Sequence, residues 1–533
     1  MSASDKKKLR NAEQTEKLTE RQAAERKEAK KLKIYTATFI IVTAILLATA
    51  ITVGVMQLID NSGFHEKNSV AMTVGDTKIN AKEMTYFYVD AVQTFYSTNA
   101  DFVSYLLDST VPLNQQMYSI AEGTTWADYF LSIAYSNAEL VYTLCAAAEA
   151  EGYTISDSEK LELESTVSIV NLYAQMYGYP DSETYLKAIY GNLANEKDFY
   201  NYQERIALAN SYRANYQASL NYDDAAIQAA QEDAFDNYSS FTFNSYYIAA
   251  SRFLEGGTED ANGTKTYSDE EKAASIAAAE EAAKALCSEE IDSIEAFDAA
   301  IANLPINADI TAQSVANKHT LYTSLDSAMA SWLAQDHQEG DMGYVPFEST
   351  TAEGTTVNGY YVLYYISRED NNMQLPTVRH ILVGSADVNN GNGTYTKADL
   401  LKYRGDAEQI LQQWKDGEQT EDAFAALATE LSIDEGSAAN GGLYENIVPG
   451  QMVDAFNDWC FDKHLEGDTG IVETSFGYHV MYFCGLTENT YREQMIIEAL
   501  TTEAMDNWFD ELATRYPMTK GESTYLPMGM TLS

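Results

Sequence analysis

Two histidines and one aspartate are the residues of this sequence whose types and surroundings could do chemistry. His380 lies in the run VRHILV, His479 in the run FGYHV and Asp434 in the run LSIDEG. An imidazole titrates near neutral pH and can donate or accept a hydrogen bond, so two histidines beside a carboxylate can move a proton or fix the polarity of a site. Either histidine alone is more often a core residue whose ring is satisfied by a neighbour. The role of the pair therefore depends on the motifs around it.

Four sequence blocks in the second half of the chain follow one another in a recognisable order. They are VRHILV (378–383), LSIDEGSAANGG (431–442), GQMVDAF (450–456) and FGYHV (476–480). Together they resemble a parvulin-type (PpiC, rotamase) peptidyl-prolyl cis/trans isomerase domain over residues 376–488. The resemblance implies a small antiparallel sheet wrapped by helices, with the site on the concave face of the sheet.

The resemblance also implies roles for single residues. His380 and His479 stand where the family has paired histidines on adjacent central strands, and Asp434 stands where it has a Cys or an Asp, so these three are the expected catalytic residues. The expected substrate-binding residues are Tyr444, Met452, Phe456 and Phe476. Met452 and Phe456 are four apart and are expected on one helix.

Isomerisation of a prolyl bond needs no covalent intermediate, metal or cofactor, and none is predicted. The barrier of ~18–20 kcal/mol exists because resonance gives the C–N bond double-bond character. An apolar pocket around the prolyl ring, and a site that removes water from the carbonyl, disfavour the planar form relative to the twisted one. We therefore expect the imidazoles of His380 and His479 to hydrogen-bond each other and to fix the polarity around Asp434, rather than to act as general acid and base.

The chain departs from the family close to the site. Many bacterial members have Gly-Gly-Asp-Leu-Gly and an aromatic residue where this chain has GGLYEN, so Tyr444 replaces the leucine of the pocket. Pro449 enters the loop before Gly450. Because of these two departures, the sequence does not predict how fast the domain catalyses isomerisation. The loop after His380 has no basic cluster, so a preference for phosphorylated substrates is not expected.

Metal and disulfide chemistry have weak support in the sequence. The four cysteines, Cys145, Cys287, Cys460 and Cys484, are too few for a disulfide framework, and no pair has metal-ligand spacing. A disulfide between Cys460 and Cys484 is the alternative, but free, buried thiols are favoured.

The polar run that starts at Asp387 suggests a calcium loop. However, glycine is not at its sixth position, and Ala398 occupies the twelfth, where a bidentate Glu is needed. We expect a solvated turn that leads to a helix capped by Thr396 and Asp399.

An internal repeat organises the second half of the chain. Residues 332–343 (WLAQDHQEGDMG) and 459–470 (WCFDKHLEGDTG) share Trp, His, Glu, Gly, Asp and Gly at a constant offset of 127. The repeat predicts two parvulin-like modules, at residues 238–370 and 376–488, each with a strand, helices and a closing strand. His337 and His464 also repeat, and we expect them to serve helix ends rather than catalysis.

The first copy has lost both histidines. Aligning the two copies by pattern places Tyr247 at the position of His380 and Tyr361 at the position of His479. We therefore interpret the first copy as an inactive module that is kept for architecture or peptide binding.

A mostly helical domain is predicted over residues 69–237. It begins with strands at 70–74 and 77–79, followed by a capping box of Asn80 and Glu83. Its opening, AMTVGDTKINAKEM, resembles the start of the N-terminal domain of SurA- and PrsA-type extracytoplasmic foldases.

A C-terminal segment, residues 489–533, is expected to complete the helical domain. An amphipathic helix at 491–516 should fold back onto that domain, and residues 523–528 are expected to add an edge strand there.

The charge distribution predicts a membrane anchor. The chain has 533 residues, 80 Asp+Glu and 34 Lys+Arg, giving a net charge of -46, which excludes nucleic acid as the main partner. A basic tail at residues 1–34 precedes the uncharged, mostly apolar residues 35–59, which are long enough to span a bilayer. The flanking charges place the N-terminus in the cytoplasm and the rest of the chain outside. The alternative is a signal peptide cleaved after residues 48–50 (ATA).

These features predict an α+β protein that resembles a membrane-anchored foldase of the PrsA and SurA type. The expected function is peptidyl-prolyl isomerase and chaperone for unfolded or partly folded exported proteins with X–Pro bonds, in the cell membrane with the bulk of the chain outside. The sequence leaves the oligomeric state undecided between a monomer and a homodimer. The alternative is a holdase chaperone whose two modules only bind, and the departures at Tyr444 and Pro449 favour it.

Overall fold

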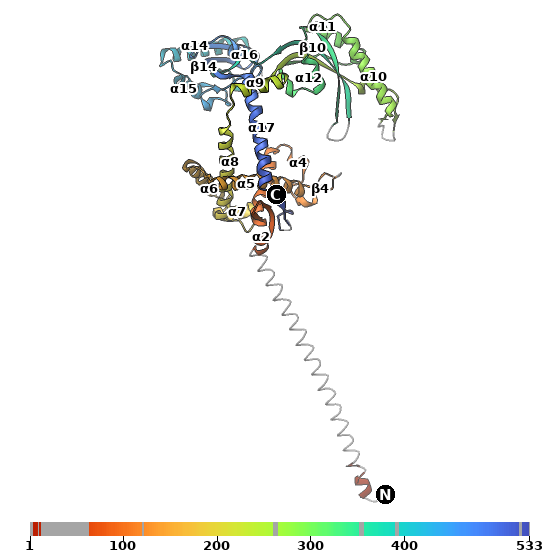
Figure 1. The fold of residues 1–533 in the computed structure, drawn as a ribbon, viewed down its shortest axis with the longest axis vertical. Helices are drawn as coiled ribbons and strands as arrows, with labels where there is room; N and C mark the ends of the chain where they lie inside the picture. Colours follow the sequence, from red (N-terminus) through yellow and green to blue (C-terminus); the bar gives the residue numbers. More distant parts are fainter. Residues whose placement is uncertain are drawn as a thin grey trace. The chain divides into compact units, whose positions relative to one another are not determined.

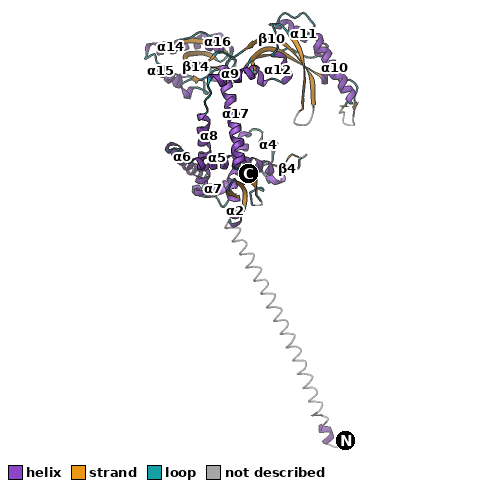
Figure 2. Ribbon diagram, in the orientation of Figure 1, coloured by secondary structure: helices purple, strands orange, loops and turns teal. Residues whose placement is uncertain are grey.

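The structure is a computed structural model that describes residues 4–8, 10–11, 63–119, 122–259, 265–350, 356–389, 394–521 and 525–531. The chain divides into two units (Figure 1). The helical unit comprises Met1–Leu220 and Met505–Ser533, and the sheet unit comprises Asn221–Ala504. Helices and antiparallel sheets are both present, as the α+β prediction requires (Figure 2).

The helical unit begins with the predicted strand, turn and strand. β1 (Val70–Val74) and β2 (Thr77–Asn80) pair antiparallel. Asn80 and Glu83 then form the predicted capping box at the start of α3 (Ala81–Thr98). The box satisfies backbone N–H groups that the first turn of a helix leaves without partners, so the strand ends where the helix begins.

Helices pack around two buried clusters in the rest of this unit, and Phe130 and Tyr88 are fully buried in the larger one. The other elements are α2 (Phe64–Asn68), α4 (Val103–Leu106), η1 (Leu113–Gln115), β3 (Met117–Ser119), β4 (Thr124–Thr125), α5 (Trp126–Glu151), α6 (Asp157–Met176), α7 (Ser182–Tyr190) and α8 (Glu196–Ser219).

The C-terminal helix returns to the helical unit, as predicted. α17 (Tyr491–Arg515) contributes Met505, Trp508 and Leu512 to a buried cluster. The Trp508 ring stacks on Tyr216, with ring centroids 4.0 Å apart. This packing covers the apolar face that the sequence leaves without a domain of its own.

The predicted C-terminal edge strand is at the wrong place. The strand is β15 (Met518–Lys520), which pairs with β1, whereas the described residues 525–528 form turns. The helix ends directly beside the edge of β1, where the Pro517 carbonyl accepts a hydrogen bond from the Gly75 N–H at 3.1 Å. The edge is therefore paired before the chain reaches residue 523.

The predicted transmembrane anchor, residues 35–59, lies outside the described residues. Across the ranges that the structure does describe, no helix combines the length and the apolar character that a membrane span requires.

The described residues of the sheet unit contain two four-stranded antiparallel sheets with corresponding strand orders, β8-β5-β10-β9 and β12-β11-β14-β13. We refer to these sheets with their helices as the first and the second module. The strands are β5 (Ser240–Ala249), β8 (Val315–Leu321), β9 (Met342–Thr350), β10 (Thr356–Glu369), β11 (Gln374–Val383), β12 (Leu443–Tyr444), β13 (Thr469–Thr474) and β14 (Gly477–Thr490). The two sheets have the same order of corresponding strands, which agrees with the sequence repeat.

Helices cover the sheets and connect them. They are α9 (Asp224–Asp233), η2 (Phe235–Tyr238), η3 (Ala250–Phe253), α10 (Asp269–Leu286), α11 (Ile294–Ala302), η4 (Pro305–Asn307), η5 (Tyr322–Ser324), α12 (Ser327–Leu333), α13 (Ala386–Asn389), α14 (Lys397–Asp416), α15 (Glu421–Leu431), η6 (Ala438–Asn440) and α16 (Asp454–Phe461). A short hairpin, β6 (Thr258–Glu259) and β7 (Lys265–Thr266), precedes α10. Thr396 and Asp399 form the predicted capping box of α14.

The sheet of the second module buries both of its faces. Ile381 and Val480 pack in a cluster with residues of α14 and α15, whereas Val378 and Met481 pack in a cluster with α16. Because side chains alternate along a strand, residues 378 and 380 on β11 share a face. The α16 face therefore carries the site histidines.

All four cysteines lie within the described residues, and each is a free thiol. Cys145 and Cys460 are buried, whereas Cys287 and Cys484 are half-buried. Cys460 packs on the α16 face of the second sheet and Cys484 on the opposite face, so the sheet separates the two sulfurs.

The repeated histidines serve helix ends, as predicted. His337 Nε2 lies 2.8 Å from the Trp332 carbonyl in the last turn of α12, and His464 Nε2 lies 2.8 Å from the Trp459 carbonyl in the last turn of α16. Each imidazole also packs on the ring of the same tryptophan. They are structural residues of the repeat.

A buried arginine joins the two modules to the start of α17. The Arg492 side chain is 1% exposed. It donates to the Phe235 carbonyl at 3.1 Å, to Ser239 Oγ at 3.0 Å and to the Asp370 carbonyl. Its guanidinium also lies over the Phe235 ring, 4.0 Å from the centroid. The segment between the modules is thus fixed by one cation whose donors are satisfied by backbone and hydroxyl oxygens.

We predict that Arg492→Ala loosens this joint by roughly 3 kcal/mol, because it leaves buried acceptors without a donor. Hydrogen exchange of residues 235–240 should become faster. Arg404→Ala is the matched control, because Arg404 pairs with Glu408 on the surface of α14. Equal exchange in both variants would contradict the assignment.

Candidate active site

Paired strands bring the two histidines together. In the β11–β14 ladder His380 lies opposite Met481 and His479 opposite Leu382, so the histidines are diagonal neighbours on one face. Their Nδ1 atoms are 2.9 Å apart, which is a hydrogen bond. The side chains are 3% and 5% exposed, so solvent does not compete for this bond.

Asp434 closes the hydrogen-bond chain at one end. Its Oδ2 accepts from His380 Nε2 at 2.8 Å, from Tyr444 OH at 3.0 Å and from Ser437 Oγ. Its Oδ1 accepts from the Gly436 N–H at 3.2 Å. The hydrogen bond from His380 is the largest cause that holds the pKa of Asp434 well below its usual range. The carboxylate is therefore ionised throughout the physiological range.

The carboxylate fixes the direction of the whole chain of hydrogen bonds. Because it can only accept, His380 Nε2 carries a proton, and a neutral His380 then accepts at Nδ1 from His479 Nδ1–H. His479 Nε2 in turn accepts from Thr474 Oγ1 at 2.8 Å. Burial, with a smaller contribution from His380, lowers the pKa of His479 to about 3. Every ring nitrogen of the pair thus has a hydrogen-bond partner, and the His479 ring stays neutral.

Ser437 and Thr474 belong to this network and are not predicted from the sequence. Ser437 is three residues after Asp434, and its Oγ lies 3.0 Å from His380 Nε2. Thr474 ends β13, and its Oγ1 also accepts from the Phe476 N–H at 3.1 Å. The only sequence signal is the short spacing of each hydroxyl from a predicted residue.

An apolar surface lies beside the imidazoles. The Phe456 ring is nearly perpendicular to both, with centroids 5.4 Å from His380 and 5.1 Å from His479. Phe456 is 2% exposed and forms the floor, whereas Tyr444 and Met452 pack on the same cluster and are only partly buried. The side chains that a substrate can reach are therefore those at the margin of the cluster.

One detail of the predicted pocket is wrong, and Phe476 stays a prediction. Met452 and Phe456 do not share a helix, because α16 begins at Asp454 and the preceding Val453 has non-helical dihedrals, φ -57° and ψ 146°. Phe476 lies in the turn between β13 and β14 with a 41% exposed side chain. Its backbone is held by the Tyr395 hydroxyl, which donates to its carbonyl at 2.9 Å.

A glycine allows β12 to approach β11. The Gly442 carbonyl accepts from the His380 N–H at 2.8 Å, and a Cβ at Gly442 would lie 2.1 Å from the His380 carbonyl oxygen. Only glycine fits there, and it also adopts φ +70°. This contact sets the position of His380 relative to Tyr444.

The first module carries different residues at the site positions than the pattern alignment predicts. Tyr361 lies opposite Val345 just as His479 lies opposite Val472, so Tyr361 corresponds to His479 as predicted. The partner of Tyr361 is Tyr247, however, which corresponds to Leu382.

The residue opposite Leu363, which corresponds to the position of His380, is Ser245. Ser245 Oγ accepts from Asn317 Nδ2 at 3.0 Å, and Asn317 corresponds to Tyr444. The alignment of Tyr247 with His380 is wrong by two residues. A shift of two residues leaves every side chain on the same face of the sheet, so the alternation of polar and apolar residues does not reveal it. The first module has neither imidazole.

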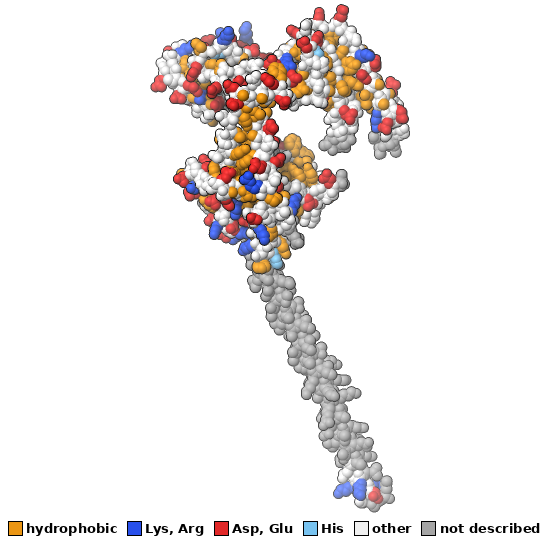
Figure 3. Space-filling view, viewed as in Figure 1, with side chains coloured by type: hydrophobic (Ala, Val, Ile, Leu, Met, Phe, Trp, Pro, Cys, Tyr) orange, Lys and Arg blue, Asp and Glu red, His pale blue; other side chains and the backbone are white. Residues whose placement is uncertain are grey.

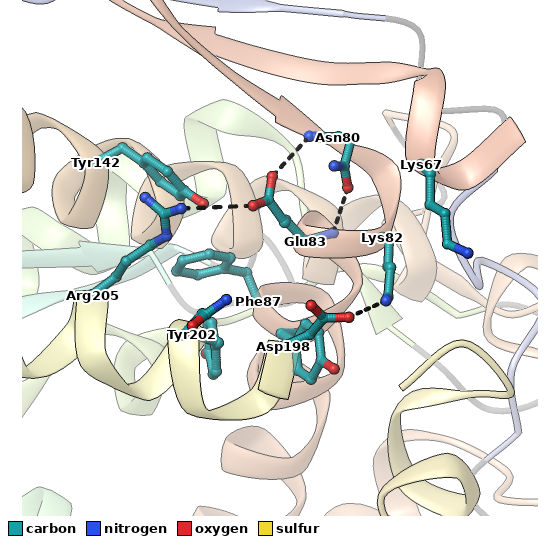
Figure 4. A pocket seen from close by; sticks show the side chains of 11 residues that line it. Lys67, Asn80, Lys82, Glu83, Phe87, Tyr142, Asp198, Tyr202 and Arg205 are labelled. Carbon is teal, nitrogen blue, oxygen red and sulfur yellow. Dashed lines mark hydrogen bonds and ion pairs between the residues drawn. The ribbon is translucent and has the colours of Figure 1, made fainter. Parts of the chain in front are cut away.

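A pocket of about 290 Å³ lies in the helical unit (Figure 4). Buried rings of Phe87, Tyr142 and Tyr202 line it. At its margin Lys82 pairs with Asp198, and Arg205 lies 3.8 Å from Glu83. These charges are already compensated, so the hollow shows no activated group.

The family comparison agrees with this geometry. Residues 361–484 match the model described as the PPIC-type PPIASE domain. The part of the chain that carries the site is therefore a peptidyl-prolyl isomerase domain of the PpiC, or parvulin, type, which confirms the class that the four sequence blocks predict.

Proteins that are similar to part of this chain are named as foldases and chaperones. The chain is 34% identical over 143 residues to the chaperone SurA of Chromohalobacter salexigens, covering 25% of this chain and 30% of that protein. It is 32% identical over 133 residues to the foldase protein PrsA 1 of Listeria innocua, covering 25% of this chain and 36% of that protein. The chain thus spans about a third of the length of these relatives.

A solved structure, that of PrsA from Bacillus subtilis, aligns with 74% of this chain and 90% of its own at 14% identity. Its TM-score is 0.23, so the alignment carries no argument about the arrangement of the domains.

We predict that His479 stays neutral down to about pH 4, because burial lowers its pKa to about 3. The chain has 6 histidines, so NMR of selectively labelled histidines, assigned with single substitutions, can follow each ring. A midpoint near 6.5 for His479 would contradict the prediction.

The same shift affects stability. Below pH ~6.5 the unfolded chain binds a proton at His479 that the folded chain does not. The free energy of unfolding therefore keeps its full value, as far as His479 is concerned, above pH ~6.5. It decreases as the pH falls towards 3, by at most ~1.4 kcal/mol per pH unit. In His479→Gln this part of the pH dependence should be absent.

Proposed function

We propose that this chain is a peptidyl-prolyl cis/trans isomerase and chaperone that assists the folding of exported proteins outside the cytoplasmic membrane. The observation that carries the proposal is the buried His380–His479 pair, tied to ionised Asp434 and packed on Phe456 within a PPIC-type domain. The relatives named chaperone and foldase support the wider role.

Rotation about the prolyl bond breaks no covalent bond, so the site has only to favour the twisted form. In that form the amide loses its resonance, and the nitrogen and the oxygen carry less opposite charge. Contact of the prolyl ring with Tyr444, Met452 and Phe476 removes water that would stabilise the planar, more polar amide. Each ~1.4 kcal/mol of such preference gives a tenfold faster rotation.

The histidines contribute by being held in fixed positions, and His479 also by remaining neutral. A charged imidazolium would attract water to the apolar surface, whereas the pair between Asp434 and Thr474 has all of its donors and acceptors satisfied internally. They are thus positioning residues that keep the floor of the site dry and the Asp434 carboxylate in one place.

An anchor formed by residues 35–59, with the basic residues 1–34 in the cytoplasm, would hold the modules on the outer side of the membrane. The substrates there are unfolded or partly folded exported chains with X–Pro bonds. Acidic side chains are spread over the face drawn in Figure 3, which favours solubility next to other anionic surfaces.

We predict that His380→Ala/His479→Ala lowers kcat/KM for a proline peptide by about tenfold or more, because water would enter the floor of the site. The rate of cis/trans exchange in the peptide is the measurement. Ser245→Ala/Tyr361→Phe changes the corresponding positions of the first module and should keep the wild-type rate. Wild-type activity in the histidine variant would refute the site assignment.

A client-holding role is the second candidate function, and an exposed apolar patch favours it. Phe102, Tyr105 and Leu106, at α4, are 66%, 86% and 47% exposed, and hydrophobic side chains gather there in Figure 3. A contiguous apolar surface of this kind is typical of an interaction site. Aromatic rings there could contact unfolded chains.

We predict that Phe102→Ser/Tyr105→Ser weakens suppression of client aggregation while leaving peptide isomerisation unchanged. Asp101→Ser/Glu122→Ser, which changes two exposed acidic residues of the helical unit, is the control. Suppression of aggregation by a chain without any isomerase activity would favour the holdase alternative. Equal suppression by both variants would show that the patch at α4 does not bind clients.

A further inference from the structure

A bulge in the first module points a histidine out of its sheet. In the β5–β8 ladder Phe241 pairs with Thr320 and Phe243 with Asn317, so Lys318 and His319 together oppose a single residue. His319 has φ +48°, a conformation that is unfavourable for most residues. The strand thus leaves its regular course at this point.

Other elements of the first module hold this bulge in place. The His319 N–H donates to Thr242 Oγ1 at 3.2 Å, and His319 Nδ1 lies 2.7 Å from Glu369 Oε2 at the end of β10. The side chains of His319 and Glu369 are 29% and 24% exposed. Strain of this kind persists only where surrounding contacts impose it.

The bulge contacts the loop of the second module that carries Met452. An ideal Cβ at Gly450 would lie 3.0 Å from His319 Cδ2, so the imidazole fills the space beside this glycine. Lys318 Nζ lies 3.0 Å from Asp454 Oδ2, at the start of α16. The loop is thus contacted on both sides of Met452.

The contact belongs to a fixed arrangement of the two modules. Buried Arg492 binds Phe235, Ser239 and Asp370 at the joint between them. Asn371, which is 1% exposed, donates to the Tyr238 carbonyl at 3.0 Å. The first module is therefore held so that β8 can reach the loop.

We propose that the first module is a support for the active site of the second, in which His319 and Lys318 are positioning residues for the loop at 450–454 and so for Met452. The proposal rests on the proposed isomerase function. The exposed Lys318–Asp454 pair contributes little by itself. The principal contact is the His319 ring, which is held by the bulge and by Glu369 and takes the space into which the Gly450 turn would move.

His319→Gly in the full chain tests this role. Glycine adopts φ +48° without strain, so the variant removes the ring while keeping the backbone favourable. Gln419→Gly is the matched control, because Gln419 also has a positive φ of 54° and lies between α14 and α15, away from the loop. Lys318→Gln in a second variant tests the ion pair alone.

We expect His319→Gly to raise KM for a proline peptide roughly three- to tenfold with kcat changed less, because a displaced pocket wall weakens binding of the prolyl ring. Hydrogen exchange of residues 450–454 should become faster in the same variant. Gln419→Gly should change neither, and Lys318→Gln should have a smaller effect than His319→Gly.

Unchanged KM and unchanged loop exchange in His319→Gly, with an active wild-type chain, would overturn the proposal. If the wild-type chain shows no isomerisation, the proposed function fails, and loop exchange alone then decides whether the first module supports the loop.

Discussion

The site depends on a carboxylate that can only accept hydrogen bonds. Asp434 receives His380, Ser437 and Tyr444 at one oxygen, and this arrangement sets the proton on His380 Nε2 and the direction of the bond between the imidazoles. A buried polar network is stable only when each member has a partner. Thr474 supplies the last one. The result is a polar chain that is closed in itself beneath an apolar surface, which suits a reaction that needs a dry, shaped site rather than proton transfer.

The sheet supplies the geometry that this chain of hydrogen bonds requires. Antiparallel pairing of β11 with β14 places two side chains as diagonal neighbours, and the close approach of β12 at Gly442 brings Tyr444 to the carboxylate. The first module has the same strand order with Ser245 and Tyr361 at the corresponding positions. The two modules thus share the scaffold but not the network. A retained contact between His319 and the Gly450 turn would explain why such a module remains beside an active one.

Much of this site can be predicted from the sequence, because His380, Asp434 and His479 lie in motifs whose order is specific. The hydroxyls of Ser437 and Thr474 cannot, since serine and threonine are common and their role exists only once the strands pair. The correspondence of Ser245 with His380 also escapes pattern analysis, because it differs from the pattern alignment by two residues, and a shift of two leaves each side chain on the same face of the sheet. Helix α16 starts after Met452 because Val453 has non-helical dihedrals, which the spacing of apolar residues does not predict. The fold class, the capping boxes and the return of the C-terminal helix follow from local patterns and were predicted.

The pH and solvent-isotope dependence of kcat/KM in the full chain tests most directly whether the imidazole pair acts as a fixed support beside the Phe456 floor rather than as a proton donor and acceptor. With the pKa of His479 lowered to about 3 and no proton moved during rotation, we expect a flat profile between pH ~5 and ~9 and equal rates in H₂O and D₂O. A bell-shaped profile with a midpoint near the ordinary pKa of histidine, together with slower turnover in D₂O, would show that the histidines exchange protons with the substrate and would contradict this mechanism.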